Sequence, residues 1–490
     1  MFCADDHTFP LPRRTFLSQS GLALGATAAA MLLAEDAAAG TRRGDTGGAD
    51  APRSPGDPLA PKRPHFAPKA KSVIYLHMIG APSQLDLFDP KPKLNELDGE
   101  VCPPSLVEGK DFAFIGGELR LAGSPYQFKQ HGQSGQTVSE LLPHFAKIVD
   151  DVAIMHSLHT DEINHAPAQM FLHSGFGRGG RPGIGAWLAY GLGSLSRDLP
   201  AYVVMLSGPA GGAGTSLWAS GFLPSVYQGV QFRSSGDPVL FLSNPEGHSR
   251  SDRRNVLDAV RSLNESHLAE TGDPEIATCI RQYEMAFRMQ SAVPELADLS
   301  GETAETLDLY GIEPGKPSFA ANCLLARRLV ERGVRVIELF DSDWDHHNNL
   351  DKRLRAKCRD VDQGMAALVT DLKRRGLLED TLVVWGSEFG RTPLSQGING
   401  EGKKTTPGRD HHKDAYTVWL AGGGIRPGTS HGATDEVGFE ITEHGVHVHD
   451  LNATLLHLLG LDHERLTFTF QGRPFRLTDV HGNVVSELLA

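Results

Sequence analysis

Cysteine is scarce in this chain, and its scarcity excludes a fold held together by a network of disulfides. Only five cysteines occur among 490 residues, whereas small secreted domains that depend on disulfides are dense in cysteine. Four would remain after loss of the N-terminal segment described next, enough for one bridge whose pairing the sequence does not reveal. Basic residues are also in the minority. The formal net charge of -13 argues against a nucleic-acid-binding protein, whose binding surface would be basic.

Long apolar runs are lacking too, so no stable membrane span is expected. The apolar run over residues 21–34 is too short to cross a bilayer as a helix. It follows Arg13 and Arg14 and precedes alanines at 37–39, which is the order of an export signal with its cleavage site. The paired arginines resemble the twin-arginine type. We therefore expect a periplasmic or secreted protein.

Three regions follow from this interpretation. Residues 1–40 are the predicted signal peptide. Residues 41–71 are rich in Pro, Gly and Arg without apolar periodicity, which is typical of a flexible linker. Residues 72–490 form the predicted folded domain.

Short apolar runs, partly β-branched, alternate with amphipathic segments in this domain. This alternation predicts an α/β fold, a doubly wound and mostly parallel sheet flanked by helices. The predicted strands are 73–78, 152–155, 201–206, 334–340, 380–385 and 415–420, and the predicted helices are 137–149, 274–289, 318–332 and 354–377.

Acidic side chains stand just past several predicted strands. Three carboxylates and two imidazoles follow the strand at 334–340, namely Asp341, Asp343, Asp345, His346 and His347, while Asp86 and Glu388 follow two other strands. Open α/β sheets bind ligands at the carboxyl ends of their strands, and oxygen and nitrogen donors suit Zn, Mn, Mg or Ca. We therefore expect a divalent metal bound by these residues. The alternative is that each acidic residue caps a helix or faces water.

Histidine is unusually clustered. The chain has 22, of which eleven lie at or after His346, many beside carboxylates. His411 and His412 stand just before the strand at 415–420. His449 either lines a substrate pocket or faces water. Pro167 indicates that Asn164 or His165 begins a helix, where backbone N–H groups favour an anionic substrate group, although an ordinary helix cap explains the pattern equally well.

The order of Asp86, Asp345, Glu388 and His411 resembles the order of metal ligands in the alkaline phosphatase and sulfatase superfamily. More closely, the motifs resemble an uncharacterised family of exported, sulfatase-like bacterial proteins. The resemblance covers residues 73–490 and is carried by Leu85-Asp86-Leu-Phe-Asp89-Pro90, Trp385-Gly-Ser-Glu388-Phe-Gly-Arg391, Gly408-Arg-Asp-His411 and His447-Val-His449-Asp450.

This resemblance implies a hydrolase of phosphate or sulfate esters that uses one or two divalent metals as Lewis acids. Asp86, Glu388 and His411 would bind one metal, with Asp345 and His347 completing a second centre. Asn164, Arg391 and His449 would contact a small-molecule or glycan ester.

The chain departs from the sulfatase pattern where sulfatases carry the catalytic Cys or Ser, because His165 stands there and Gln169 replaces an arginine. Three nucleophiles remain: a water activated by the metal, which we rank first, His165 itself, or a displaced Thr160. A second hypothesis also remains open. The protein could be an exported binding or structural protein that keeps the fold without turnover.

Overall fold

The computed structural model describes residues 57–490, apart from 111, 234–237, 241 and 397–406. The predicted signal peptide and residues 41–56 of the predicted linker lie outside the described residues. Residues 57–71 pack on the domain and do not form a free linker. Leu59 is buried, Lys62 donates its backbone N–H to Leu192, and Ala70 donates to Leu458.

The expected fold class is confirmed. Within the described part of the chain, nine strands form one sheet in the order β12-β4-β11-β8-β1-β7-β5-β6, and β15 also pairs with β4. All neighbouring strands are parallel except β11, which is antiparallel to both β4 and β8. The strands are β1 (Ser72–Met78), β4 (Val152–His159), β5 (Tyr202–Ser207), β6 (Val230–Phe232), β7 (Val336–Asp341), β8 (Thr381–Gly386), β11 (Tyr416–Ala421), β12 (Ser430–His431) and β15 (Val446–His447).

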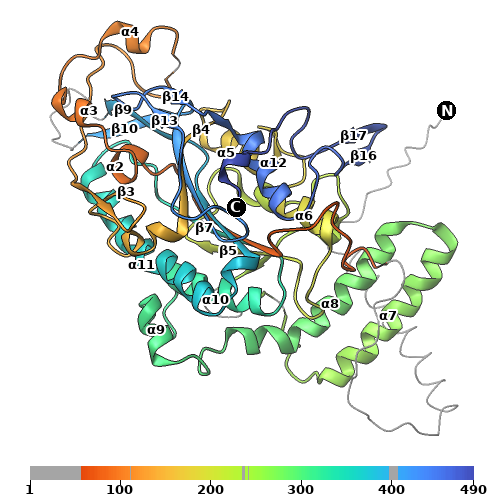
Figure 1. Ribbon diagram of the computed structural model, residues 1–490. Helices are drawn as coiled ribbons and strands as arrows, with labels where there is room; N and C mark the ends of the chain where they lie inside the picture. Colours follow the sequence, from red (N-terminus) through yellow and green to blue (C-terminus); the bar gives the residue numbers. More distant parts are fainter. Residues whose placement is uncertain (1–56, 111, 234–237, 241, 397–406) are drawn as a thin grey trace, which may run out of the picture.

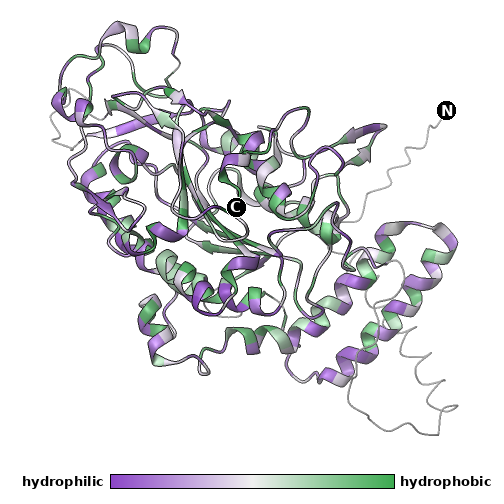
Figure 2. Cartoon of the chain, in the orientation of Figure 1, coloured by the Kyte–Doolittle hydropathy of each residue, from purple (hydrophilic) through white to green (hydrophobic). Residues whose placement is uncertain are grey.

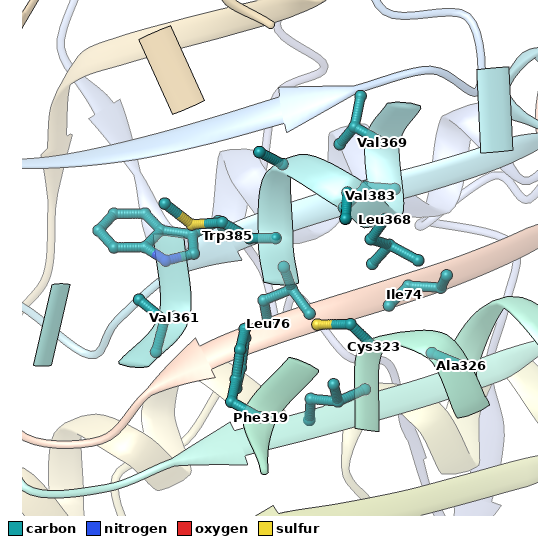
Figure 3. Packing of buried hydrophobic residues seen from close by; sticks show 14 of the residues in the cluster. Ile74, Leu76, Phe319, Cys323, Ala326, Val361, Leu368, Val369, Val383 and Trp385 are labelled. Atoms are coloured by element: carbon teal, nitrogen blue, oxygen red, sulfur yellow. The ribbon is translucent and has the colours of Figure 1, made fainter. Parts of the chain in front are cut away.

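Helices cover both faces of this sheet (Figure 1). Alternate residues of β1 point to opposite faces. Ile74 and Leu76 therefore join α10 and α11 in one core, which Figure 3 shows, whereas Val73 and Tyr75 face a second core with α5, α6 and α12. The helices are α5 (His165–Ser174), α6 (Ile184–Leu192), α7 (Arg250–Thr271), α8 (Pro274–Ala297), α9 (Ala304–Tyr310), α10 (Phe319–Glu331), α11 (Leu350–Arg374) and α12 (Val448–Leu458).

Smaller elements surround the sheet. The central strands are apolar, whereas hydrophilic residues cover much of the periphery, including α7 (Figure 2). The four described cysteines are free, so the bridge that the sequence allowed does not form. The remaining elements are α2 (Gln84–Leu87), α3 (Pro92–Glu96), α4 (Pro104–Val107), β2 (Phe128–His131), β3 (Gln136–Ser139), β9 (Gly390–Gln396), β10 (Gly408–His412), β13 (Ala433–Thr434), β14 (Ile441–Glu443), β16 (Phe468–Phe470) and β17 (Arg473–Phe475), with short 3₁₀ turns between them.

One predicted helix is wrong. The spacing at 137–149 predicts a helix, but the structure has β3 there, followed by 3₁₀ turns at Phe145–Lys147 and Val149–Asp151. Pro143 explains the difference, because proline lacks an N–H donor and its ring collides with the preceding helical turn. No helix among the described residues is long and apolar enough to cross a membrane.

Candidate metal centre

Four side chains from three distant segments meet beyond the carboxyl end of β7. They are His165, the first residue of α5, Asp345 and His347 in the loop from β7 to α11, and His411 in β10. One ligand atom from each lies within 4.8 Å of the others. This group is called the metal cluster below. It contains three of the five predicted metal ligands and, in addition, His165, which the sequence suggested as a nucleophile.

Hydrogen bonds orient the three imidazoles of the metal cluster. His165 Nδ1 lies 2.7 Å from Glu388 Oε1, and His347 Nδ1 lies 2.6 Å from Gln396 Oε1. His411 Nδ1 lies 2.8 Å from the carbonyl oxygen of Ile163. All three partners are acceptors, so each Nδ1 carries the proton and donates. In the neutral ring the lone pair then resides on Nε2.

These Nε2 atoms converge on one carboxylate oxygen. Asp345 Oδ1 lies 3.3 Å from His165 Nε2, 2.8 Å from His347 Nε2 and 3.5 Å from His411 Nε2. His347 Nε2 and His411 Nε2 are 3.1 Å apart. Several lone pairs facing one another repel unless a cation lies between them.

The donor set therefore fits a metal ion. Zinc–nitrogen bonds of about 2.0–2.1 Å place the ligand atoms of a tetrahedral site roughly 3.3 Å apart, close to the 2.8–3.5 Å separations from Asp345 Oδ1. Three nitrogens and one oxygen are typical of zinc and other first-row transition metals, whereas calcium and magnesium prefer oxygen.

In the metal-free chain a proton takes the place of the cation. Burial lowers the pKa of His165, but its hydrogen bonds to Asp345 and Glu388 outweigh this effect and raise the pKa to about 9. Burial raises the pKa of Asp345, yet the three histidines hold it below its usual value. The pKa of His411 is lowered, mainly by burial. A metal ion must therefore displace one proton from His165 at neutral pH.

Glu388 contacts the metal cluster through His165 but is not one of its four members. Its Oε1 accepts hydrogen bonds from His165 Nδ1, from the Gly80 N–H at 3.0 Å and from Gln169 Nε2 at 2.9 Å. The carboxylate is fully buried, and its pKa stays well below the usual range because hydrogen bonds from His165 and His77 outweigh the effect of burial. Glu388 thus holds His165 in place, and its predicted role as a direct metal ligand stays a prediction.

Asp86 is also outside the metal cluster. It is fully buried and forms a two-point ion pair with Arg409, whose Nε lies 2.8 Å from Oδ2 and whose Nη2 lies 3.3 Å from Oδ1. Ser83 donates a further hydrogen bond to Oδ2. The guanidinium already balances this carboxylate, and the structure does not bring Asp86 together with Glu388 and His411 as the resemblance implied.

Arg391 supports the metal cluster through hydrogen bonds within the chain. Its side chain is buried and donates to the carbonyl oxygens of Gly80, Ala81 and Arg409 and to Asp345 Oδ1. These bonds tie the loops after β1 and β7 to β10. The contact of Arg391 with a substrate stays a prediction.

The other predicted site residues lie around α5. Asn164 is the N-cap of α5, without a side-chain capping bond. Thr160 is buried, and its backbone N–H donates to Lys413. His449, in α12, is buried against Phe171 and stacked on His481 at 5.1 Å, so it does not belong to the metal cluster.

Comparison with known proteins gives a family and remote structural likenesses. The model of a family described as "Protein of unknown function (DUF1501)" matches residues 70–489. No curated protein matches the chain. One similar solved structure is Ps i-CgsB in complex with k-i-k-neocarrahexaose, at 11% identity and a TM-score of 0.36, covering 80% of this chain and 72% of that one.

Two further structures show the same degree of likeness. The alkaline phosphatase from the Antarctic bacterium TAB5 is 10% identical with a TM-score of 0.34, covering 81% of this chain and 99% of that chain. The PsFucS1 sulfatase from Pseudoalteromonas sp. is 14% identical with a TM-score of 0.35, covering 86% and 72%. At such low similarity, the chemistry has to be derived from the residues of this chain.

Proposed function

This chain belongs to the family described as a protein of unknown function (DUF1501), and we propose that it is an exported, metal-dependent hydrolase of phosphate or sulfate esters. The observation that carries the proposal is a group of three imidazoles and one carboxylate whose ligand atoms lie within 4.8 Å of one another. The side chains of Asp345 and His347 are 42% and 23% exposed, which leaves an approach for a substrate.

We propose zinc or another first-row transition metal, held by His165, Asp345, His347 and His411, with one metal per chain. Such a cation acts as a Lewis acid that stabilises negative charge on the transferred phosphoryl or sulfuryl group. A single centre follows because Arg409 already neutralises Asp86. Metal analysis of the folded protein tests this stoichiometry.

The chain's own residues orient the site. Glu388 fixes the ring of His165, and Arg391 fixes the carboxylate of Asp345. Since His165 belongs to the ligand set and Thr160 is buried, water is the nucleophile that fits this arrangement best. The nearby N-terminus of α5 contributes backbone N–H groups that favour an anion.

Turnover of a panel of aryl and sugar phosphates and sulfates tests the proposal. The metal-loaded wild type should hydrolyse at least one class, while Asp345→Ala and His411→Ala should not. His412→Gln is the matched control, because His412 is adjacent in β10 but bonds to the Phe439 carbonyl at 2.9 Å. This variant should retain the wild-type rate.

A metal-binding protein without turnover is the second candidate. The observation that favours it is His165, a metal-cluster residue at the position where the sulfatase pattern has its nucleophile. Metal bound at one equivalent with no hydrolysis anywhere on the panel would decide for this candidate.

Export through the twin-arginine pathway is a separate part of the proposal. It is supported by Arg13 and Arg14 ahead of a short apolar run. A reporter fused to residues 1–40 should reach the periplasm, and replacement of both arginines by lysine should keep it in the cytoplasm.

A further inference from the structure

Phe114 is an exposed aromatic ring beside the metal cluster. It is 63% exposed, and its ring centre lies 5.1 Å from that of His347 and 5.2 Å from that of His411. Both ring pairs are nearly perpendicular, at 85°. Phe114 therefore borders the point on which the Nε2 atoms converge, while much of its surface stays in contact with water.

The surrounding loop holds this ring in place. The backbone N–H of Phe114 donates to Asp410 Oδ2 at 3.1 Å, and Asp410 is fully buried next to His411. On either side, Phe112 and Ile115 pack against a small core that includes Leu121 and Phe439. The loop thus partly buries Phe112 and Ile115 and leaves Phe114 largely exposed.

We propose that Phe114 contacts the alcohol portion of the ester and selects alcohols with a flat apolar ring next to the ester oxygen. The inference rests on the proposed function, because a transferred group at the metal cluster places its alcohol portion beside the rim. A phenyl side chain offers no hydrogen bond, so it gains contact from an apolar face and little from a fully hydroxylated one. Two aromatic rings also prefer offset-stacked or edge-to-face arrangements, which an aliphatic group does not offer.

Calorimetric binding to the metal-loaded full chain tests this inference without turnover. The probes are two pairs, phenylphosphonate with methylphosphonate and benzenesulfonate with methanesulfonate. Within the pair that binds, the wild type should bind the phenyl compound about tenfold more tightly than the methyl compound. This factor is the size expected for one aromatic contact together with the apolar area that it buries. Phe114→Ala should bring this ratio close to one, and Phe114→Leu should leave it intermediate.

Phe470→Ala is the matched control, since Phe470 is an exposed phenylalanine (38%) in β16, well away from β10 (Figure 1). Its ratio should equal that of the wild type, and metal content should be unchanged in all variants. Equal binding of both methyl and phenyl probes by the wild type, or an unchanged ratio in Phe114→Ala and Phe114→Leu, would overturn the role of Phe114 and leave the hydrolase proposal intact. Failure of all four probes to bind would overturn both.

Discussion

Replacing Glu388 by glutamine should weaken metal binding while leaving the fold intact. Three donors, from His165, Gly80 and Gln169, point at one oxygen of this carboxylate. A glutamine carbonyl can occupy the position of Oε1 and accept these three bonds, while its NH2 group replaces Oε2, which faces Ser387 and His77. The substitution therefore removes the negative charge and keeps the shape of the side chain. The neutral amide then makes the imidazole of His165 a poorer electron donor.

The expected size of this effect depends on pH. Loss of such a supporting carboxylate typically costs 10–100-fold in metal affinity, or about 1.4–2.7 kcal/mol. In the wild type, a metal competes with a proton on His165 below its pKa of about 9, which burial lowers and the bonds to Asp345 and Glu388 raise more strongly. Glu388→Gln lowers that pKa and eases the competition. The loss of affinity should therefore be largest at pH 9 and smaller at pH 7.

Competition with a chromogenic zinc chelator at both pH values measures this difference. Glu338→Gln is a matched control, because Glu338 is equally buried and contacts His173 and Tyr202 but no member of the metal cluster. Equal losses of affinity in Glu388→Gln and Glu338→Gln would refute the reasoning. So would a loss at pH 7 that exceeds the loss at pH 9.

Three other predictions follow from the same geometry. Asp86→Ala should cost about 3–5 kcal/mol in urea unfolding, because it leaves buried Arg409 without its partner, yet the folded fraction should still bind one metal. The metal-free chain should lose on the order of 3 kcal/mol as pH rises from 6.5 through 9, because a raised folded-state pKa of His165 stabilises the fold only while the proton stays bound; the measurement is urea unfolding with a chelator present. Gly80→Ala should lower metal affinity in the chelator assay, because Gly80 has φ +109° and an added Cβ would lie 2.6 Å from Asp345 N.

The sheet could be predicted from sequence because buried parallel strands leave a strong local pattern. All six predicted strands correspond to strands of the structure, from β1 to β11. In contrast, α7 (Arg250–Thr271) was not predicted, because it is mostly exposed and polar and Leu257 is its only buried residue. Its start carried a signal all the same: Ser249 and Asp252 form a capping box.

The metal cluster could be predicted only in part. Asp345, His347 and His411 belong to it, since loops after parallel strands gather at one edge of the sheet. The place of His165 in the metal cluster was not predicted, because its position at the start of a helix does not show where its imidazole points. The pairing of Asp86 with Arg409 joins residues 323 positions apart. No local pattern encodes such a contact.

The four members of the metal cluster span the chain from His165 to His411, and Arg391 joins the loop after β1 to β10. During synthesis, a growing chain that has emerged only as far as α11 has three of the four donors and lacks both Arg391 and β10. Such an intermediate lacks His411, so under the proposed function a metal ion would be bound only late, after most of the sheet has formed. Under that proposal, chains halted before residue 408 would bind less zinc than the full chain.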